Sequence, residues 1–311
     1  MLYVLIQESS SSGLGKQREE SISSTMDNHC GMFQQLLCFL TIFLTVGVAF
    51  GGRGKFDSSL LRSVVDKNMN QPDADAWGYA CVEDSTGPSH WSDLSPDYSL
   101  CSSGKAQSPV SIESFNLKVD ESLPPLDLTY DNSEDYVNAT VLNDGHNVKI
   151  IRGGGTLVFR GVNYSLTEFH FHTPSEHTLD GKSYPIEMHL THVSESGAIA
   201  IVVAFSELSA DDNSKFSQYF PLFPHLQVGQ PLHDVSSKII PTPKDMFEYY
   251  VYEGSLSEPP CTENVLYTIL KKVYFVSPRQ VKWLQEAVNV HNNRPIQPLN
   301  SRTVYTTKYF Q

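Results

Sequence analysis

Three histidines in two short segments have the residue type and spacing of a metal site. His170 and His172 lie one residue apart in Glu168-Phe-His-Phe-His172, and His189 lies in Glu187-Met-His-Leu190. Side chains two residues apart on a strand point to the same face, so the first two histidines would face one way. Three neutral imidazoles that converge from two strands are suitable ligands for a catalytic zinc ion, whose fourth position stays open for water.

Each segment also places an acid two residues before a histidine. Glu168 precedes His170 and Glu187 precedes His189, in each case on the same strand face. Histidines that bind a metal usually donate their second ring N–H to a carboxylate or a carbonyl, which fixes the tautomer. We therefore expect Glu168 and Glu187 to orient these two ligands.

Two other histidines fit structural roles better. His192 falls on the strand face opposite His189, and His177 lies in the link between the two segments, residues 173–183. The link contains Asp180-Gly181, a turn signal that lets the second strand fold back antiparallel beside the first. We expect His192 and His177 to be hydrogen-bonded structural residues.

The first 76 residues differ from the rest of the chain. Residues 36–50 form an apolar run that is short for a membrane span and typical of a signal-peptide core. We expect an N-terminal extension and signal peptide over residues 1–51, with a signal anchor as the alternative. Residues 52–76 read as a linker or pro-segment, and residues 77–311 as one domain without a stable membrane span.

Other features favour a secreted, extracellular or lumenal protein. The sequons at Asn138 and Asn163 are potential glycosylation sites, expected on surface loops. Three cysteines follow the leader, Cys81, Cys101 and Cys261, and an oxidising compartment would allow one disulfide and one leftover thiol.

The net charge of −13 argues against nucleic acid as a partner, because phosphate binding needs clustered Lys and Arg.

Short alternating or apolar segments bounded by turn residues predict a mainly β fold with a few peripheral helices. The predicted strands are residues 148–151, 156–159, 168–172, 186–191, 198–205 and 265–270. The run at 198–205 is continuously apolar, which is typical of a central strand covered on both faces. One helix is predicted after Ser277, which is followed by Pro278 at the first helical position and by Gln280, the pattern of a capping box.

Together these motifs resemble the alpha-class carbonic anhydrases. The matching segments keep that family's order and approximate spacing. They are Trp77-Gly-Tyr79, Gly87-Pro-Ser-His-Trp91, Gln107-Ser-Pro-Val110, Asn143-Asp-Gly-His146, Phe169-His-Phe-His172, Ser175-Glu-His177, Glu187-Met-His-Leu190, Gly254-Ser-Leu-Ser-Glu-Pro-Pro260 and Asn293-Arg-Pro295. The resemblance implies a single domain around a twisted, mostly antiparallel sheet of about ten strands with short peripheral helices.

The resemblance also implies a reaction. Zn2+ would be held by His170, His172 and His189, and zinc-bound hydroxide would attack carbon dioxide to give bicarbonate and a proton, reversibly. Ser257 would occupy the family's gatekeeper threonine position, and Glu176 would match the buried glutamate that accepts the gatekeeper's hydrogen bond. Serine lacks the threonine methyl group, so its hydroxyl can adopt an additional rotamer, and we expect a modest loss in catalytic rate. Sulfonamide-type and anion-type inhibitors are expected to bind.

Proton export would use residues of the segment around His146. His146 matches the family's proton-shuttle histidine and is expected to be an exposed loop residue. Tyr79 and Asn147 resemble the residues that order the connecting waters. Arg294 matches a position that is structural in the family.

The substrate pocket departs from the family pattern at several positions. Its matching residues are Thr191, Ile201, Leu256, Tyr267 and Glu258. Thr191 and Tyr267 replace the usual valine and tryptophan. Glu258 would place a carboxylate near the cavity mouth, where it could repel departing bicarbonate, repel entering bicarbonate, or compete with Ser257 for hydrogen bonds. Glu168, commonly glutamine in relatives, should hold zinc more tightly and raise the pKa of its water.

The resemblance also bears on the cysteines and prolines. Cys101 and Cys261 match the pair that secreted relatives join, which would leave Cys81 free. Ser108-Pro109 and Pro259-Pro260 resemble the family's cis-proline positions.

Two alternatives remain open at this point. The first is a low-activity or inactive relative that serves as a binding, matrix or storage protein, a reading that Ser257, Thr191 and Glu258 keep open. The second is a cupin, because His170, His172 and Glu176 mimic that fold's first metal motif. The residues around His189 lack the glycine and asparagine that the second cupin motif needs.

Overall fold

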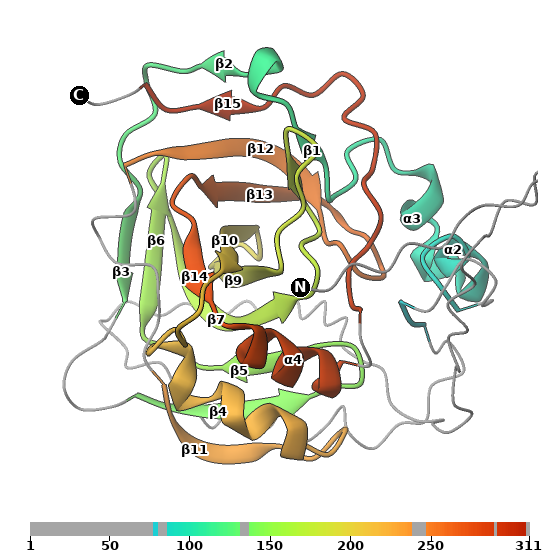
Figure 1. Ribbon diagram of the computed structural model, residues 1–311. Coiled ribbons are helices and arrows are strands. Elements are labelled where there is room, and N and C mark those ends of the chain that lie inside the picture. The colour runs from blue at the N-terminus through green and yellow to red at the C-terminus, as the bar shows by residue number, and fades with distance from the viewer. Residues whose placement is uncertain (1–76, 80–85, 131–136, 238–246, 289–290, 309–311) are drawn as a thin grey trace, which may run out of the picture. The chain divides into compact units, whose positions relative to one another are not determined.

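The computed structural model describes residues 77–79, 86–130, 137–237, 247–288 and 291–308 (Figure 1). The segments predicted at 1–51 and 52–76 lie outside the described residues, as does Cys81. Among the described residues, no helix has the length and apolar character needed to cross a membrane.

The main sheet of the described residues is mixed and twisted and has 13 strands. Its main path joins, in spatial order, β11 (Leu232–Ser237), β4 (Val137–Asn143), β5 (Val148–Ile151), β7 (Val162–His172), β9 (Ile186–Ser194), β10 (Ile199–Leu208), β13 (Glu263–Leu270), β12 (Tyr249–Ser255), β15 (Tyr305–Thr306) and β2 (Lys118–Val119). In Figure 1, β11 and β4 form the lower edge of this sheet, and β15 and β2 form the upper edge. The mainly β fold with a mostly antiparallel sheet is confirmed.

Smaller elements extend this sheet. β6 (Gly155–Phe159) pairs with β7 and with β3 (Asp127–Tyr130), and β14 (Tyr274–Val276) pairs with β10. β1 (Ser111–Ile112) and β8 (Thr178–Leu179) form a separate parallel pair. The helices of the described residues are α2 (Trp91–Leu94), α3 (Leu100–Ser103) and α4 (Pro278–Ala287), with 3-10 turns η1 (Pro96–Tyr98), η2 (Ser114–Asn116), η3 (Phe216–Gln218) and η4 (Phe220–His225).

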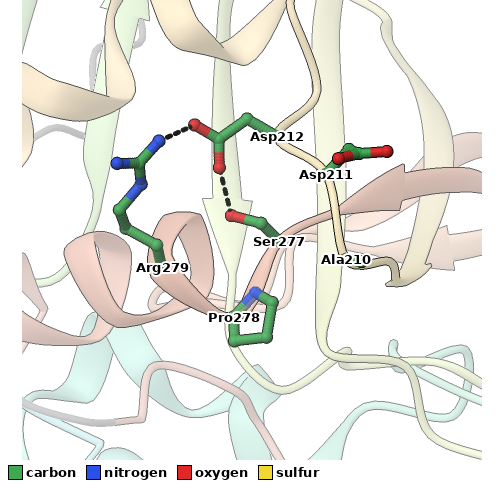
Figure 2. Close-up of a pocket in the computed structure, with 6 residues that line it drawn as sticks. All are labelled: Ala210, Asp211, Asp212, Ser277, Pro278 and Arg279. Carbon is green, nitrogen blue, oxygen red and sulfur yellow. Dashed lines mark hydrogen bonds and ion pairs between the residues drawn. The ribbon is translucent and has the colours of Figure 1, made fainter.

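The predicted capping box of α4 is confirmed. The Ser277 hydroxyl accepts a hydrogen bond from the Gln280 backbone N–H at 3.1 Å, and the Gln280 side chain accepts one from the Ser277 N–H at 3.2 Å. Figure 2 shows Asp212 reaching this same helix start, where it accepts hydrogen bonds from Ser277 and Arg279. The pocket drawn there lies at the α4 N-terminus and shares no residue with the histidine site described below.

Strand register places the candidate site on one face of the sheet. His170 of β7 pairs directly with His189 of β9 on one side and with Lys149 of β5 on the other. Directly paired residues of antiparallel strands project to the same face, so these three side chains form one row. His172, two residues from His170, projects to the same face.

The opposite face carries the larger core. Phe169 and Phe171 of β7, like Met188 and Leu190 of β9, are at most 1% exposed. Aromatic side chains of η3 and η4 cover them, and the Phe171 and Phe220 rings meet edge to face at 5.0 Å. Each fully buried side chain of this kind stabilises the fold by about 1.5–3 kcal/mol, so the period-two alternation of both strands fixes which face turns to the site.

The antiparallel return of the second strand beside the first is confirmed, because β7 pairs antiparallel with β9. Inside the link, Asp180 and Gly181 both have positive φ, 49° and 74°, and their turn closes a bridge between Leu179 and Lys182. One detail of the sequence predictions was wrong: Asn138 and Asn163 lie in β4 and at the start of β7, not in loops, because their segments pair with neighbouring strands.

Candidate metal centre

Three histidines bring their ring nitrogens together at the site. The candidate ligand atoms of His170, His172 and His189 all lie within 4.8 Å of one another. The Nε2 atoms of His170 and His172 are 3.1 Å apart. All three residues are buried, with exposed fractions of 7%, 1% and 1%. The two strands therefore converge their imidazoles on one point, as the period of the sequence requires.

Protein acceptors occupy the second nitrogen of each ring. His170 Nδ1 lies 3.0 Å from Glu168 Oε2, and His172 Nδ1 donates to the Asn292 carbonyl at 2.7 Å. His189 Nε2 lies 2.6 Å from Glu187 Oε1. These contacts leave His170 Nε2, His172 Nε2 and His189 Nδ1 as lone-pair donors. Three free imidazole nitrogens in a buried site fit a zinc ion that keeps a fourth position open.

The protonation tendencies of the three rings differ. Burial lowers the pKa of His172 well below its usual value, and the nearby His189 and His170 add to this effect. Burial also lowers the pKa of His189, against the opposing effect of Glu187. Burial acts in the same direction on His170, but the Glu168 carboxylate outweighs it and raises the pKa. A bound cation would displace any proton from these nitrogens.

A chain of buried hydrogen bonds holds the Glu187 carboxylate in place. Glu187 accepts from the His177 backbone N–H at 2.8 Å and contacts His177 Nδ1 at 2.7 Å. His177 Nε2 lies 2.6 Å from the Tyr252 hydroxyl, which lies 2.8 Å from Ser108 Oγ. His177, Glu187 and His189 could also form a metal-binding group. Their polar atoms already bond to one another, so we assign His177 and Glu187 to the support of His189.

Ser257 and Glu176 lie beside the histidines. Ser257 is 6% exposed and Glu176 is 2% exposed. Glu176 Oε1 accepts from the Arg294 backbone N–H at 2.9 Å, and Oε2 lies 3.5 Å from His172 Nε2. Burial raises the pKa of Glu176 well above its usual range, Glu187 adds to the rise, and the Arg294 N–H and the Ser257 hydroxyl act against it. Within the described residues, Glu176 Oε2 is buried and has no hydrogen-bond partner.

Arg294 contacts the scaffold and not the histidines. Its guanidinium donates to Gln107 Oε1 at 2.9 Å, the Ser108 carbonyl at 2.8 Å and the Cys101 carbonyl at 2.9 Å. These contacts join segments that lie nearly 200 residues apart in sequence, since the Cys101 bond spans 193 positions. This placement agrees with a structural role.

His146 is half-buried, whereas we expected an exposed loop residue. Its ring stacks on the Trp77 indole with centroids 3.8 Å apart and planes 11° apart. Trp77 also contacts Tyr79 edge to face at 5.3 Å. The Tyr79 hydroxyl is buried and makes no hydrogen bond within the described residues. Burial raises its pKa, and Glu176 and Glu258 add to the rise.

Three of the expected pocket residues, Thr191, Ile201 and Tyr267, lie on the histidine face of the sheet. Thr191 pairs with Glu168 across β7 and β9, and with Ile201 across β9 and β10. Ile201 pairs in turn with Tyr267 of β13, whose hydroxyl donates to the Ser255 carbonyl at 2.8 Å. Burial raises the pKa of Glu168, but His170, Lys149 and the Thr191 hydroxyl together produce a net lowering.

Glu258 bonds to residues other than Ser257. Its Oε2 accepts from Asn147 Nδ2 at 2.9 Å, and its Oε1 lies 3.5 Å from Lys149 Nζ. Lys149 Nζ also lies 2.8 Å from Asp144 Oδ2. These contacts therefore do not show Glu258 competing with Ser257 for hydrogen bonds. Sequence reasoning missed Lys149, although the alternation of β5 could have placed it on the histidine face.

Comparison with known proteins identifies the family. A family model described as eukaryotic-type carbonic anhydrase matches residues 86–308. A carbonic anhydrase of Pectobacterium atrosepticum is 32% identical over 256 residues, which cover 81% of this chain and 99% of that relative. An alpha-carbonic anhydrase from Thermovibrio ammonificans, solved with the inhibitor sulfanilamide, aligns with a TM-score of 0.68 at 36% identity, over 75% of this chain and 100% of that one.

The chain belongs to the alpha-carbonic anhydrase family. A solved dioscorin in complex with ascorbate is also similar, with a TM-score of 0.69 at 31% identity over 76% of this chain and 100% of that one. Membership of the alpha-carbonic anhydrase family excludes the cupin alternative.

Two further expectations for this family member are confirmed. Cys101 and Cys261 form a disulfide that spans 160 residues of sequence. Ser108-Pro109 and Pro259-Pro260 are cis, as is Thr173-Pro174.

Proposed function

We propose that this carbonic anhydrase family member catalyses the reversible hydration of carbon dioxide to bicarbonate and a proton, with zinc held by His170, His172 and His189. The observation that carries the proposal is the convergence of three buried imidazole nitrogens. The second nitrogen of each of these rings contacts an acceptor of the protein. Zinc in such a site supplies a Lewis acid that lowers the pKa of a coordinated water from 15.7 to about 7.

The remaining residues would orient the reactants and move the proton. Ser257 would donate its hydroxyl hydrogen to Glu176 and would accept a hydrogen bond from the attacking oxygen through its lone pairs. This direction requires an ionised Glu176, which can accept but not donate. His146, which stacks on Trp77, would pass the proton to solvent as an imidazole, although burial lowers its pKa below the ordinary value of histidine. Thr191, Ile201, Leu256 and Tyr267 would form the wall beside carbon dioxide.

Related proteins and the disulfide support two further parts of the proposal. Because the Thermovibrio ammonificans relative was solved with sulfanilamide, we expect sulfonamides to bind this site. The Cys101–Cys261 disulfide favours an oxidising compartment, in agreement with a secreted, extracellular or lumenal protein. Glycosylation at Asn163, whose side chain is exposed, is compatible with that location.

A second candidate function is a binding or storage role with little turnover. It is favoured by the similarity to a dioscorin that was solved with ascorbate. Against it, this chain keeps all three converging histidines and the Ser257–Glu176 pair. Zinc content together with a stopped-flow measurement of carbon dioxide hydration separates the two functions.

The test uses His189→Ala and a matched control, His225→Ala, whose imidazole is exposed in η4. We expect His189→Ala to lose stoichiometric zinc and to lower kcat/KM by at least about 10²-fold, because one of three ligands is gone. His225→Ala should retain both properties. Hydration that survives His189→Ala unchanged would refute the mechanism. Zinc at full occupancy with negligible hydration in the wild type would support the binding role.

A companion variant examines the gatekeeper position. Ser257→Thr restores a second substituent on Cβ and restricts χ1, so the hydroxyl should spend more time directed at Glu176. We expect kcat to rise by a few-fold with the zinc content unchanged. A fall in kcat would show that this pocket has no room for the methyl group.

A further inference from the structure

A lysine lies beside the first histidine ligand, at a position the proposed mechanism does not use. Lys149 of β5 pairs in register with His170, so its side chain projects to the same face of the sheet. Its ammonium group lies between two carboxylates, 2.8 Å from Asp144 Oδ2 and 3.5 Å from Glu258 Oε1. We call Asp144, Lys149 and Glu258 the ion-pair set.

Glu258 is fixed at both its backbone and its side chain. Its carbonyl accepts a hydrogen bond from the Cys261 N–H at 2.9 Å, and Cys261 is held by the disulfide. Its carboxylate accepts from Asn147 Nδ2 at 2.9 Å. Since Glu258 directly follows Ser257, this charge lies next to the proposed gatekeeper. Its side chain is 25% exposed, so it is also reached by solvent.

Asp144 and Asn147 tie the ion-pair set to the metal ligands. Asp144 Oδ1 accepts from the backbone N–H groups of His146 and Asn147, at 2.9 and 2.7 Å. Asn147 Oδ1 accepts from Asn292 Nδ2 at 2.8 Å, and the Asn292 carbonyl holds His172. The positions of these charges relative to the histidines are therefore fixed by hydrogen bonds.

The ion pair between Lys149 and Asp144 favours the charged form of both groups. Burial acts against the charge of Lys149, but Asp144 and Glu258 outweigh it and raise the pKa. Burial likewise raises the pKa of Asp144, but Lys149 and His146 bring it down to about 2. The set carries one positive and two negative formal charges.

We propose that the ion-pair set determines the affinity of the metal centre for small monovalent anions, bicarbonate among them, with Glu258 weakening and Lys149 strengthening their binding. The proposal rests on the proposed function, because it requires a metal at the three histidines. Its physical basis is Coulombic, because an anion that approaches the histidines meets the surplus of one negative charge that the ion-pair set carries. Neutralising Glu258 or removing the charge of Lys149 changes that surplus by one unit.

The test uses the full chain loaded with cobalt(II), whose visible absorption responds to an anion that enters the coordination sphere, and thiocyanate as the probe. Four forms are compared: the wild type, Glu258→Gln, Lys149→Met and the double variant. The Glu258→Gln change keeps an acceptor for Asn147, so the charge is altered with little loss of hydrogen bonding. The formal charge of the set is −1 in the wild type, 0 in Glu258→Gln, −2 in Lys149→Met and −1 in the double variant.

We expect Glu258→Gln to bind thiocyanate about three- to tenfold more tightly and Lys149→Met to bind it more weakly by a similar factor. The double variant should return close to the wild-type dissociation constant. KM for bicarbonate dehydration should follow the same order. A purely structural ion pair predicts something else, because both single variants would then shift affinity in the same direction and the double variant would not recover.

Three results are decisive. Opposite shifts with recovery in the double variant support the proposal. Equal thiocyanate affinity in all four forms, or shifts of the same sign, overturns it. If cobalt fails to bind the wild type at all, the metal centre itself is wrong and the proposed function fails, an outcome that the absorption spectrum reports before any anion is added.

Discussion

At the scale of single residues, the site depends on which nitrogen of each histidine is left free. Glu168, Asn292 and Glu187 each accept from one ring of the histidine triad. Two of these acceptors are carboxylates and one is a backbone carbonyl, so the rings differ in basicity. A carboxylate partner makes an imidazole a stronger donor to a metal than a neutral acceptor does.

Replacing Glu168 by glutamine should therefore weaken metal binding. Glu168→Gln keeps an acceptor for His170 Nδ1 but removes its charge, and we expect zinc affinity to fall about 10- to 100-fold. The inflection of the pH–rate profile should move to lower pH, since less negative charge surrounds the coordinated water. Competition with a chelator measures the affinity.

The control for this prediction is Glu207→Gln. This change removes an exposed carboxylate of β10 that pairs with Lys182, far from the histidines. Its zinc affinity should equal that of the wild type. A wild-type pH–rate inflection clearly below neutrality would contradict the effect assigned to Glu168.

At the scale of elements, strand β9 separates two histidines by function. His189 faces the triad, whereas His192 lies on the opposite face, where Nδ1 donates to the Leu190 carbonyl at 2.9 Å and Nε2 lies 3.2 Å from the Tyr130 hydroxyl. Burial lowers the pKa of His192 to about 4. Our expectation of a hydrogen-bonded residue at this position agrees with these contacts.

The depressed pKa of His192 makes stability depend on pH. Between the ordinary pKa of about 6.5 and the folded value of about 4, the unfolded chain binds more protons, so stability is lost as pH falls through this window. His192→Gln should remove about 2–3 kcal/mol of the stability change between pH 7.5 and pH 4.5. Urea unfolding at the two pH values measures this. An unchanged difference between them would count against the assignment.

The start of helix α4 supports a second element-scale prediction. Ser277 accepts from the Gln280 N–H and donates to Asp212 at 2.5 Å, as Figure 2 shows for Asp212. Ser277→Ala removes both bonds and should lower the free energy of unfolding by about 1–2 kcal/mol. The matched control is Ser301→Ala, at an exposed loop position, which should change it by less than about 0.5 kcal/mol. Denaturant titration of the two variants compares them.

At the scale of the whole molecule, long-range links hold the site together. The disulfide joins α3 to the segment that follows Ser257, and the Arg294 guanidinium bonds the Cys101 carbonyl from a third segment. These links fix the Ser257–Glu258 segment against the sheet. The fold therefore positions the gatekeeper by tying together three distant parts of the chain.

Removing the disulfide should destabilise the protein strongly. For a loop that spans 160 residues, the chain-entropy relation gives about 5 kcal/mol. We expect the double variant Cys101→Ser/Cys261→Ser to show this loss in denaturant unfolding. Wild-type protein unfolded under reducing conditions serves as the comparison and should match the double variant. Equal stability of the oxidised and reduced wild type would contradict the prediction.

The sequence by itself determined the parts of this protein that depend on local pattern. Alternation with a period of two put His170 and His172 on one face and Phe169 and Phe171 on the other, because a strand leaves no other choice. The capping box of α4 was readable for the same reason, since its partners lie three residues apart. The six predicted strands correspond to β5, β6, β7, β9, β10 and β13.

Only the tertiary structure decided the contacts between distant segments. The Asn292 carbonyl that holds His172 lies 120 positions away in sequence, and the Asn147 amide that holds Glu258 lies 111 positions away. No local period encodes such pairs, because they depend on strand register and on loops that bend toward the site. The half-burial of His146 under Trp77 and the placement of Lys149 between two carboxylates follow from that same long-range packing.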